Sequence, residues 1–98
     1  MTMPVTYIVV DIETDGPRPG HHAMRNLAAV AIDAQGYELA SFSINLTAPE
    51  DTSPDPDTLE WCKTKQPDIW ALITDEPEAT LIAMAKFSNF VRSLKKNA

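Results

Sequence analysis

The chain has 98 residues, of which 44% are hydrophobic and 22% are charged. This length allows one domain and excludes two, and the composition is that of a folded globular chain rather than a disordered one. Eight Lys and Arg against fourteen Asp and Glu give a net charge of −6, which excludes non-specific binding to polyanions through a basic surface.

No apolar run approaches the roughly 18 residues that cross a bilayer, and residues 1–4 do not begin a signal peptide. We therefore expect no membrane contact and a cytoplasmic location. The single cysteine, Cys62, cannot form an intramolecular disulfide, and no Cys or His cluster has the spacing of a zinc site. A polyanionic partner would need a divalent cation, held by carboxylates, to attract its phosphates.

Three strands are predicted in the first half of the chain. Residues 7–13 (YIVVDIE) are mainly β-branched and aromatic, and their apolar run is typical of a strand covered on both faces at the centre of a mixed sheet. Residues 14–24 hold two glycines and two prolines and are expected to form a loop. Strands at about 27–33 and 37–46, joined by a turn at 34–36 that contains Gly36, indicate an antiparallel hairpin.

Three helices are predicted in the second half. Residues 57–60 (DTLE) match a capping box and begin a short helix that runs to about residue 64, and a second helix covers about 67–73. Residues 75–78 (DEPE) repeat the box and predict a long helix from Pro77 to about Lys95. Its apolar stripe consists of Ala79, Ala83, Phe87, Phe90, Val91 and Leu94.

This order of elements leaves the first strand with a neighbour on one side only. A right-handed crossover normally leads from the helices to a strand parallel to the first, and these 98 residues contain no such strand. The predicted sheet is therefore incomplete. An unpaired apolar edge is a template for pairing with another chain, so we expect self-association through it if the chain ends at Ala98.

Asp11 and Glu13 are the candidate catalytic and metal-binding residues. They lie two apart on a strand, so both side chains leave the same face, about 6 to 7 Å apart. Two carboxylates at the end of a central strand occupy the usual ligand position of open α/β sheets, and they suit Mg²⁺ or Mn²⁺. Taken alone this spacing is weak evidence, because such acids usually solvate a sheet edge or a turn.

The residues around the pair add a resemblance. Residues 9–16 (VVDIETDG) resemble the first motif of the DEDD superfamily of 3′ to 5′ exonucleases, which have the ribonuclease H-like fold. Residues 17–24 (PRPGHHAM), running into 27–31, are similar to a bacterial exonuclease or exoribonuclease branch, and residues 57–61 are similar to that branch's helix after the hairpin. The resemblance implies an α/β fold with a ribonuclease H-like mixed sheet. Residues 1–98 would be a partial exonuclease domain, with strands over 5–46 and helices over 57–96.

In that superfamily four acids bind two divalent metals, and a His or Tyr is the general base. The resemblance assigns Asp11 to both metals, Glu13 to one metal and the attacking water, and the backbone near Thr14 to the terminal nucleotide. The implied activity is hydrolysis of phosphodiester bonds at the 3′ end of RNA or single-stranded DNA. The third acid, the final acid and the base have no counterparts in this sequence, so the 98-residue chain alone is expected to be inactive.

Two alternatives remain open. The missing acids are compatible with a non-catalytic ribonuclease H-like module for protein interaction. An acidic hydrolase or phosphatase unrelated to nucleases is less favoured, because its aspartate nucleophile is not normally followed by Glu, Thr and an Asp-Gly turn.

Other residues have simpler interpretations. His21 and His22 are candidates for the general base, but a polar loop explains them better. Arg18 and Arg25 are candidates for phosphate contact from the loop beside the pair, although we favour solvated surface arginine. Trp61 and Trp70 are candidates for base stacking, but on short helices after a hairpin we expect them to be core anchors. Asp55 and Asp57 are better explained as helix caps than as metal ligands.

Overall fold

The computed structural model describes residues 4–95. Strands β1 (Tyr7–Thr14), β2 (Met24–Ile32) and β3 (Glu38–Asn45) precede helices α1 (Pro56–Lys65), α2 (Pro67–Ile73) and α3 (Thr80–Lys95). The strands form one sheet in the order β1-β2-β3, and both neighbouring pairs are antiparallel. The α/β class and the predicted order of three strands followed by helices are therefore confirmed. The ribonuclease H-like form of the sheet stays a prediction.

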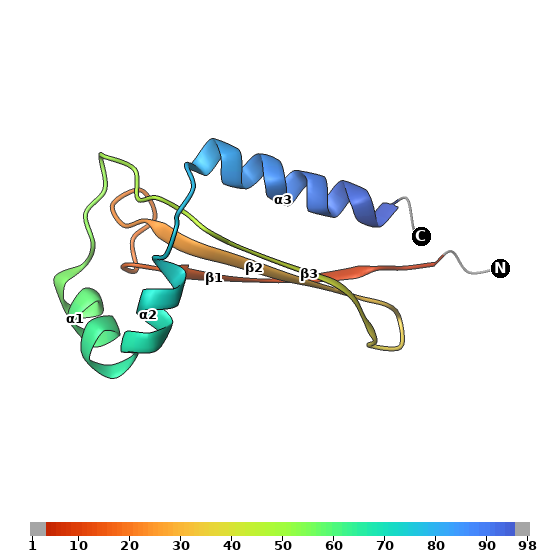
Figure 1. Cartoon of the computed structure of the whole chain (residues 1–98), viewed down its shortest axis with the longest axis horizontal. Helices are drawn as coiled ribbons and strands as arrows, with labels where there is room; N and C mark the ends of the chain where they lie inside the picture. Colours follow the sequence, from red (N-terminus) through yellow and green to blue (C-terminus); the bar gives the residue numbers. More distant parts are fainter. Residues whose placement is uncertain (1–3, 96–98) are drawn as a thin grey trace.

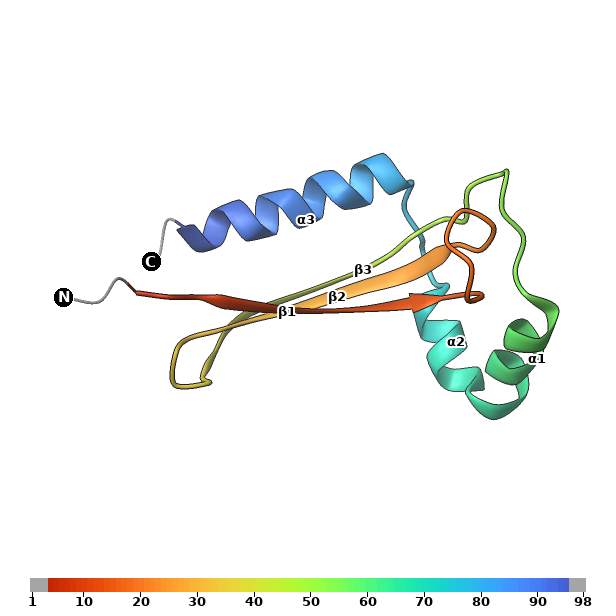
Figure 2. The same ribbon diagram turned by 180° about the vertical axis from the view of Figure 1, so that it is seen from behind.

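Helix α3 lies along one face of the sheet, whereas α1 and α2 lie on the other side at one end (Figures 1 and 2). The core lies under α3, where Leu27 of β2, Leu46 and Ala83 are buried together. Phe42 of β3 contacts α3 through Phe87 and Phe90, with ring centroids 5.9 and 5.3 Å apart. The predicted apolar stripe of α3 faces the sheet, except that Ala79 precedes the helix and is exposed.

The prediction that β1 is covered on both faces at the centre of a sheet is wrong for the described residues. Strand β1 lies at an edge, and Ile8 is its only side chain that is even partly buried. The long apolar run correctly indicated a strand. Burial depends on neighbours that a local pattern does not contain, and β1 has one neighbouring strand among residues 4–95.

The start of α1 differs from the predicted capping box. Asp55, not Asp57, is the N-cap: its Oδ2 accepts hydrogen bonds from the Thr58 amide at 3.0 Å and the Thr58 hydroxyl at 2.9 Å. These bonds favour the ionised carboxylate and lower the pKa of Asp55. Asp57 lies in the first turn, where a negative charge is favourable. Helix α2 spans the predicted residues.

Helix α3 starts at Thr80, three residues later than predicted. The backbone of Glu78 pairs with the end of β3 instead of entering the helix. Its amide donates to the Asn45 carbonyl at 2.9 Å, and its carbonyl accepts from the Thr47 amide at 2.9 Å. This extended pairing competes with the capping box and prevails, because it satisfies two backbone groups of a strand end.

The molecule is elongated. Its radius of gyration is 15.8 Å, against about 13 Å for a compact chain of 100 residues. The fully buried hydrophobic side chains are mainly alanines, and many large ones on β1, α1 and α2 are exposed. No helix among the described residues is long and apolar enough to span a membrane.

Candidate metal and nucleotide site

Asp11 and Glu13 lie on the sheet face opposite α3. In the register of β1 against β2, Asp11 is opposite Ala28 and Glu13 is opposite Asn26, so the two carboxylates project from the same face. Both are exposed, and neither forms an ion pair or a side-chain hydrogen bond with any other residue in 4–95. The oxygens of both are therefore available to a cation.

A cavity of about 240 Å³ lies beside this pair, between the end of β1 and the two short helices. Glu13 and Thr14 line it from the sheet. Trp61 and Cys62 line it from α1, and Trp70 is among the residues that line it from α2. One of the two predicted carboxylates thus borders an apolar cavity with two indole rings.

Thr14 lies where the register of β1 and β2 shifts. Glu13 is opposite Asn26 but Thr14 is opposite Met24, so Arg25 is the extra residue of a bulge. The Thr14 hydroxyl donates a hydrogen bond to the Gly16 carbonyl at 2.9 Å. This bond and the bulge end the strand at the cavity and turn the chain into the loop.

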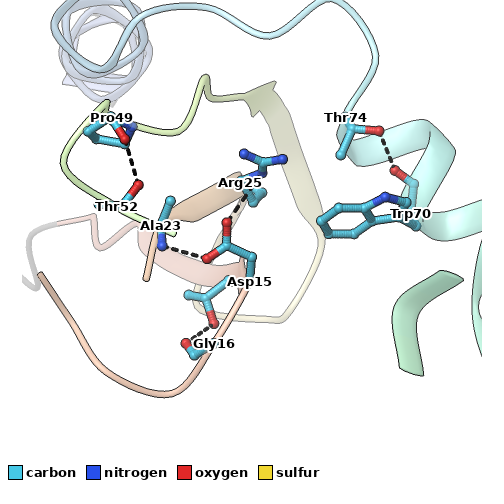
Figure 3. A network of polar contacts seen from close by, with 9 residues as sticks. Asp15, Gly16, Ala23, Arg25, Pro49, Thr52, Trp70 and Thr74 are labelled. Atoms are coloured by element: carbon cyan, nitrogen blue, oxygen red, sulfur yellow. Dashed lines mark hydrogen bonds and ion pairs between the residues drawn. The ribbon is translucent and has the colours of Figure 1, made fainter. Parts of the chain in front are cut away.

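Asp15 anchors that loop from inside the protein (Figure 3). Its side chain is 0% exposed, and its Oδ1 accepts a hydrogen bond from the Ala23 amide at 2.6 Å. Its Oδ2 lies 3.8 Å from Nε of Arg25, and the Arg25 guanidinium lies 5.4 Å from the centroid of the Trp70 ring. Arg25 therefore links the loop to α2, and the expectation of a solvated surface arginine is wrong for this residue.

The two histidines of the loop are placed differently. His22 is half-buried against Gly16, where a Cβ would come within 2.3 Å of the imidazole ring, and its Nδ1 accepts from the Arg18 amide at 2.9 Å. His21 is exposed. His22 therefore packs within the loop, and neither histidine lines the cavity beside Glu13.

The prediction of two core anchors fails for Trp61. Trp61 is 55% exposed and borders the cavity, whereas Trp70 is half-buried under Arg25. The exposure of Trp61 is compatible with the alternative interpretation, base stacking, which stays a prediction. The sequence of α1 has few apolar residues, which is a signal against a core position for Trp61. In the structure α1 buries no residue completely.

Cys62 reports the electrostatics of the cavity. Burial raises the pKa of its thiol, and the nearby carboxylates of Glu13 and Asp15 raise it further. The raised pKa favours the neutral thiol of Cys62 at physiological pH. The carboxylates impose a negative potential on the cavity, and a divalent cation would neutralise it.

No group of three or more His, Cys, Asp or Glu within residues 4–95 is arranged to hold a metal ion. Asp11 and Glu13 are thus two carboxylate ligands without a third from the described chain. Water and substrate oxygens would have to complete the coordination of a hard cation, which is common for Mg²⁺. Comparison of the sequence with protein-family models and with curated proteins gave no match.

Proposed function

We propose that this chain is the N-terminal part of a metal-dependent 3′ to 5′ exonuclease, a hydrolase that cleaves phosphodiester bonds of RNA or single-stranded DNA. One observation carries the proposal: two carboxylates without ion pairs share one sheet face, and one of them borders a cavity with an exposed indole. The resemblance of residues 9–16 to the first exonuclease motif gives this arrangement its chemical interpretation.

In this proposal Asp11 and Glu13 hold Mg²⁺ or Mn²⁺ through their exposed oxygens. Such ions would supply positive charge that stabilises the negative charge developing on the phosphoryl and leaving oxygens of a phosphodiester. The net charge of −6 makes this cation the means by which an acidic protein attracts a polyanion.

The cavity offers a place for the terminal nucleotide of the substrate. The exposed face of Trp61 provides a surface on which a base stacks, and stacking of this kind tolerates any base. Thr14 lines the same cavity next to Glu13. A nucleotide between them would keep its phosphate near the carboxylates.

Two further acids and a general base complete such a site in the resembling superfamily, and the sequence contains no counterpart for them. We therefore expect the 98-residue chain alone to be inactive, and activity requires that these residues be supplied from outside it.

The test is the substitution Asp11→Ala in the longest open reading frame that contains this sequence. Release of mononucleotides from a 3′-labelled single strand is measured with Mn²⁺. We expect a loss of at least about a hundredfold, because electrostatic stabilisation of the transition state is removed. Glu38→Gln, an exposed strand carboxylate at the other edge of the sheet, is the matched control and should retain activity. Full activity of the Asp11→Ala variant would refute the proposal.

A second candidate is a non-catalytic module that uses this fold for protein contact. The absence of a three-ligand group among residues 4–95 favours it. The same assay separates the two candidates, because the module predicts no metal-dependent release of nucleotides in the unsubstituted protein.

A further inference from the structure

Gln66 lines the cavity of about 240 Å³ that also borders Glu13 and the two tryptophans. Its residue is half-buried, and its side-chain carboxamide forms no hydrogen bond with any other residue in 4–95. A partly buried amide without a partner is unfavourable, because it has lost contact with water without gaining a protein contact. This carboxamide is therefore free to bind a polar ligand in the cavity.

The backbone of Gln66 is held by both short helices. The residue lies at the junction of α1 and α2, where its amide donates a hydrogen bond to the Cys62 carbonyl at 3.1 Å. Its carbonyl accepts one from the Trp70 amide at 2.9 Å, and Pro67 begins α2 directly after it. The junction fixes where the side chain starts. The carboxamide at its tip can still turn, because the last torsion of Gln has a broad, roughly two-fold preference.

The other polar side chains of the cavity are less suited to a neutral base. The Thr14 hydroxyl already donates its hydrogen to the Gly16 carbonyl at 2.9 Å, so only its lone pairs remain. The Glu13 carboxylate accepts and does not donate, and the proposed function assigns it to a cation. The thiol of Cys62 is a weak donor and a weak acceptor. Among the described residues that line the cavity, Gln66 alone offers a strong donor and a strong acceptor together.

We infer that Gln66 binds the polar edge of the terminal base that stacks on Trp61, and that it accepts every base there. This inference rests on the proposed function, because it takes the nucleotide in the cavity as given. An unstacked base presents a donor and an acceptor side by side on its Watson–Crick edge. In cytosine these are the N4 amino group and N3, and in uracil they are N3–H and O4. A carboxamide matches either pair after a half-turn of its tip.

The lack of a partner for the carboxamide makes this contact tolerant. A neighbour that bonded its oxygen or its nitrogen would hold one orientation, and the site would then select between cytosine and uracil. No residue in 4–95 forms such a bond. Stacking on an indole tolerates any base as well. Neither contact distinguishes the bases, which suits an enzyme that removes successive nucleotides whatever their sequence.

Binding of CMP and UMP tests the inference, because their bases differ only at N3 and at the substituent on C4. The protein from the longest open reading frame that contains this sequence is titrated with each nucleotide in Mn²⁺ at about pH 8, where carboxylates are ionised. Tryptophan fluorescence gives the dissociation constants. We expect the unsubstituted protein to bind both nucleotides within about threefold of each other. No binding, or a larger preference for either nucleotide, would overturn the inference.

Gln66→Glu should make this tolerant site selective. A carboxylate only accepts hydrogen bonds, so the amino group of cytosine can donate to it. The N3–H of uracil lies between two carbonyl oxygens, which repel a carboxylate. We expect CMP to bind more tightly than UMP by at least about tenfold. The added charge acts on both nucleotides alike, so it does not alter their ratio. An unchanged ratio would contradict the inference.

Gln35→Glu is the matched control for Gln66→Glu. Gln35 is exposed in the turn between β2 and β3, and it does not line the cavity. The substitution makes the same change of charge, and the ratio of the CMP and UMP dissociation constants should stay at its original value. A preference for CMP in this variant too would show that the ratio responds to net charge rather than to a contact with the base.

Gln66→Leu removes the hydrogen bonds and leaves an apolar side chain of similar size. We expect CMP and UMP each to bind at least about threefold more weakly, with their ratio unchanged. A difluorotoluene nucleotide has the shape of a pyrimidine but no strong hydrogen-bonding groups, and it should bind the variant and the unsubstituted protein equally. Equal weakening of all three nucleotides would mean that the substitution disturbs the stacking surface and that Gln66 does not bind the base.

These results are distinguishable from a failure of the proposed function. If Asp11→Ala abolishes nucleotide release while the Gln66 variants bind CMP and UMP as the unsubstituted protein does, the exonuclease proposal stands and the role of Gln66 is refuted. If Gln66→Glu acquires the preference for CMP but the unsubstituted protein releases no nucleotides, the cavity binds bases and the exonuclease proposal is refuted.

Discussion

Asp15 and Arg25 decide how the candidate site is held. Asp15 is fully buried, and its carbonyl accepts a hydrogen bond from the Asp55 amide at 2.8 Å, so it joins the end of β1 to the start of α1. Arg25 joins the same carboxylate to Trp70 of α2. Removal of one partner from a buried ion pair leaves an uncompensated charge and is strongly destabilising. The two residues therefore position both sides of the cavity, although neither of them lines it.

At this scale Cys62 provides a direct probe of Glu13. The Glu13 carboxylate raises the pKa of the thiol, so Glu13→Gln should lower this pKa and increase the thiolate fraction at mildly alkaline pH. We expect faster alkylation of Cys62 by iodoacetamide in the folded protein, and Glu38→Gln should leave the rate unchanged. An unchanged rate in Glu13→Gln would mean that Glu13 does not face the cavity.

The same shift fixes the sign of a pH effect. Because the folded-state pKa of Cys62 is raised, folding favours the neutral thiol. Its contribution to stability is complete below the unfolded-state pKa, about 8.5, and is lost as the pH rises through the folded-state value.

The helices differ in how they are attached. Helix α3 packs its apolar stripe on the sheet, whereas α1 and α2 bury no residue completely. The two short helices are held mainly by polar links, among them hydrogen bonds from the Asn45 side chain to the carbonyls of Leu72 and Asp75, both at 2.8 Å. Stability should therefore depend on α3, and the shape of the cavity on the polar links.

Two substitutions in α3 separate packing from helix propensity. Phe87→Ala removes a partly buried ring from the core and should lower the free energy of unfolding by about 2 to 3 kcal/mol. Leu81→Ala removes a side chain that is 86% exposed in the same helix, and its effect should stay within about 0.5 kcal/mol. Urea denaturation followed by circular dichroism measures both. Equal losses would show that α3 does not pack as described.

The whole molecule is acidic and elongated, and both properties bear on its partners. A net charge of −6 opposes the approach of a polyanion, so the proposed binding of nucleic acid would depend on a bound cation and on stacking. The molecule is elongated, and its sheet is covered by α3 on one face while β1 is left exposed.

We therefore expect nucleic-acid binding to depend on divalent ions. Fluorescence anisotropy of a 3′-labelled single-stranded oligonucleotide should show binding with Mn²⁺ that EDTA weakens by at least about tenfold, or 1.4 kcal/mol. Asp11→Asn should weaken binding in Mn²⁺ to a similar extent and have little effect in EDTA. Equal affinity with and without Mn²⁺ would contradict a cation-mediated contact.

The amino-acid pattern alone determined the elements and the candidate pair. The β-branched run, the Gly-containing turn before Tyr37 and the apolar stripe of α3 are local signals, and local backbone preference and side-chain period suffice to interpret them. The same period of two places Asp11 and Glu13 on one face, as the register of β1 and β2 bears out. The metal and the substrate assigned to that pair stay predictions.

Only the tertiary structure decided which surfaces are covered. Helix α3 starts at Thr80 because Glu78 pairs with the end of β3. Asp15 is buried next to Arg25, and Trp61 is exposed at the cavity that Glu13 also lines. Each of these outcomes depends on a contact between segments far apart in the chain. A local pattern states what a residue prefers, but its burial and its partners follow from which distant elements meet it.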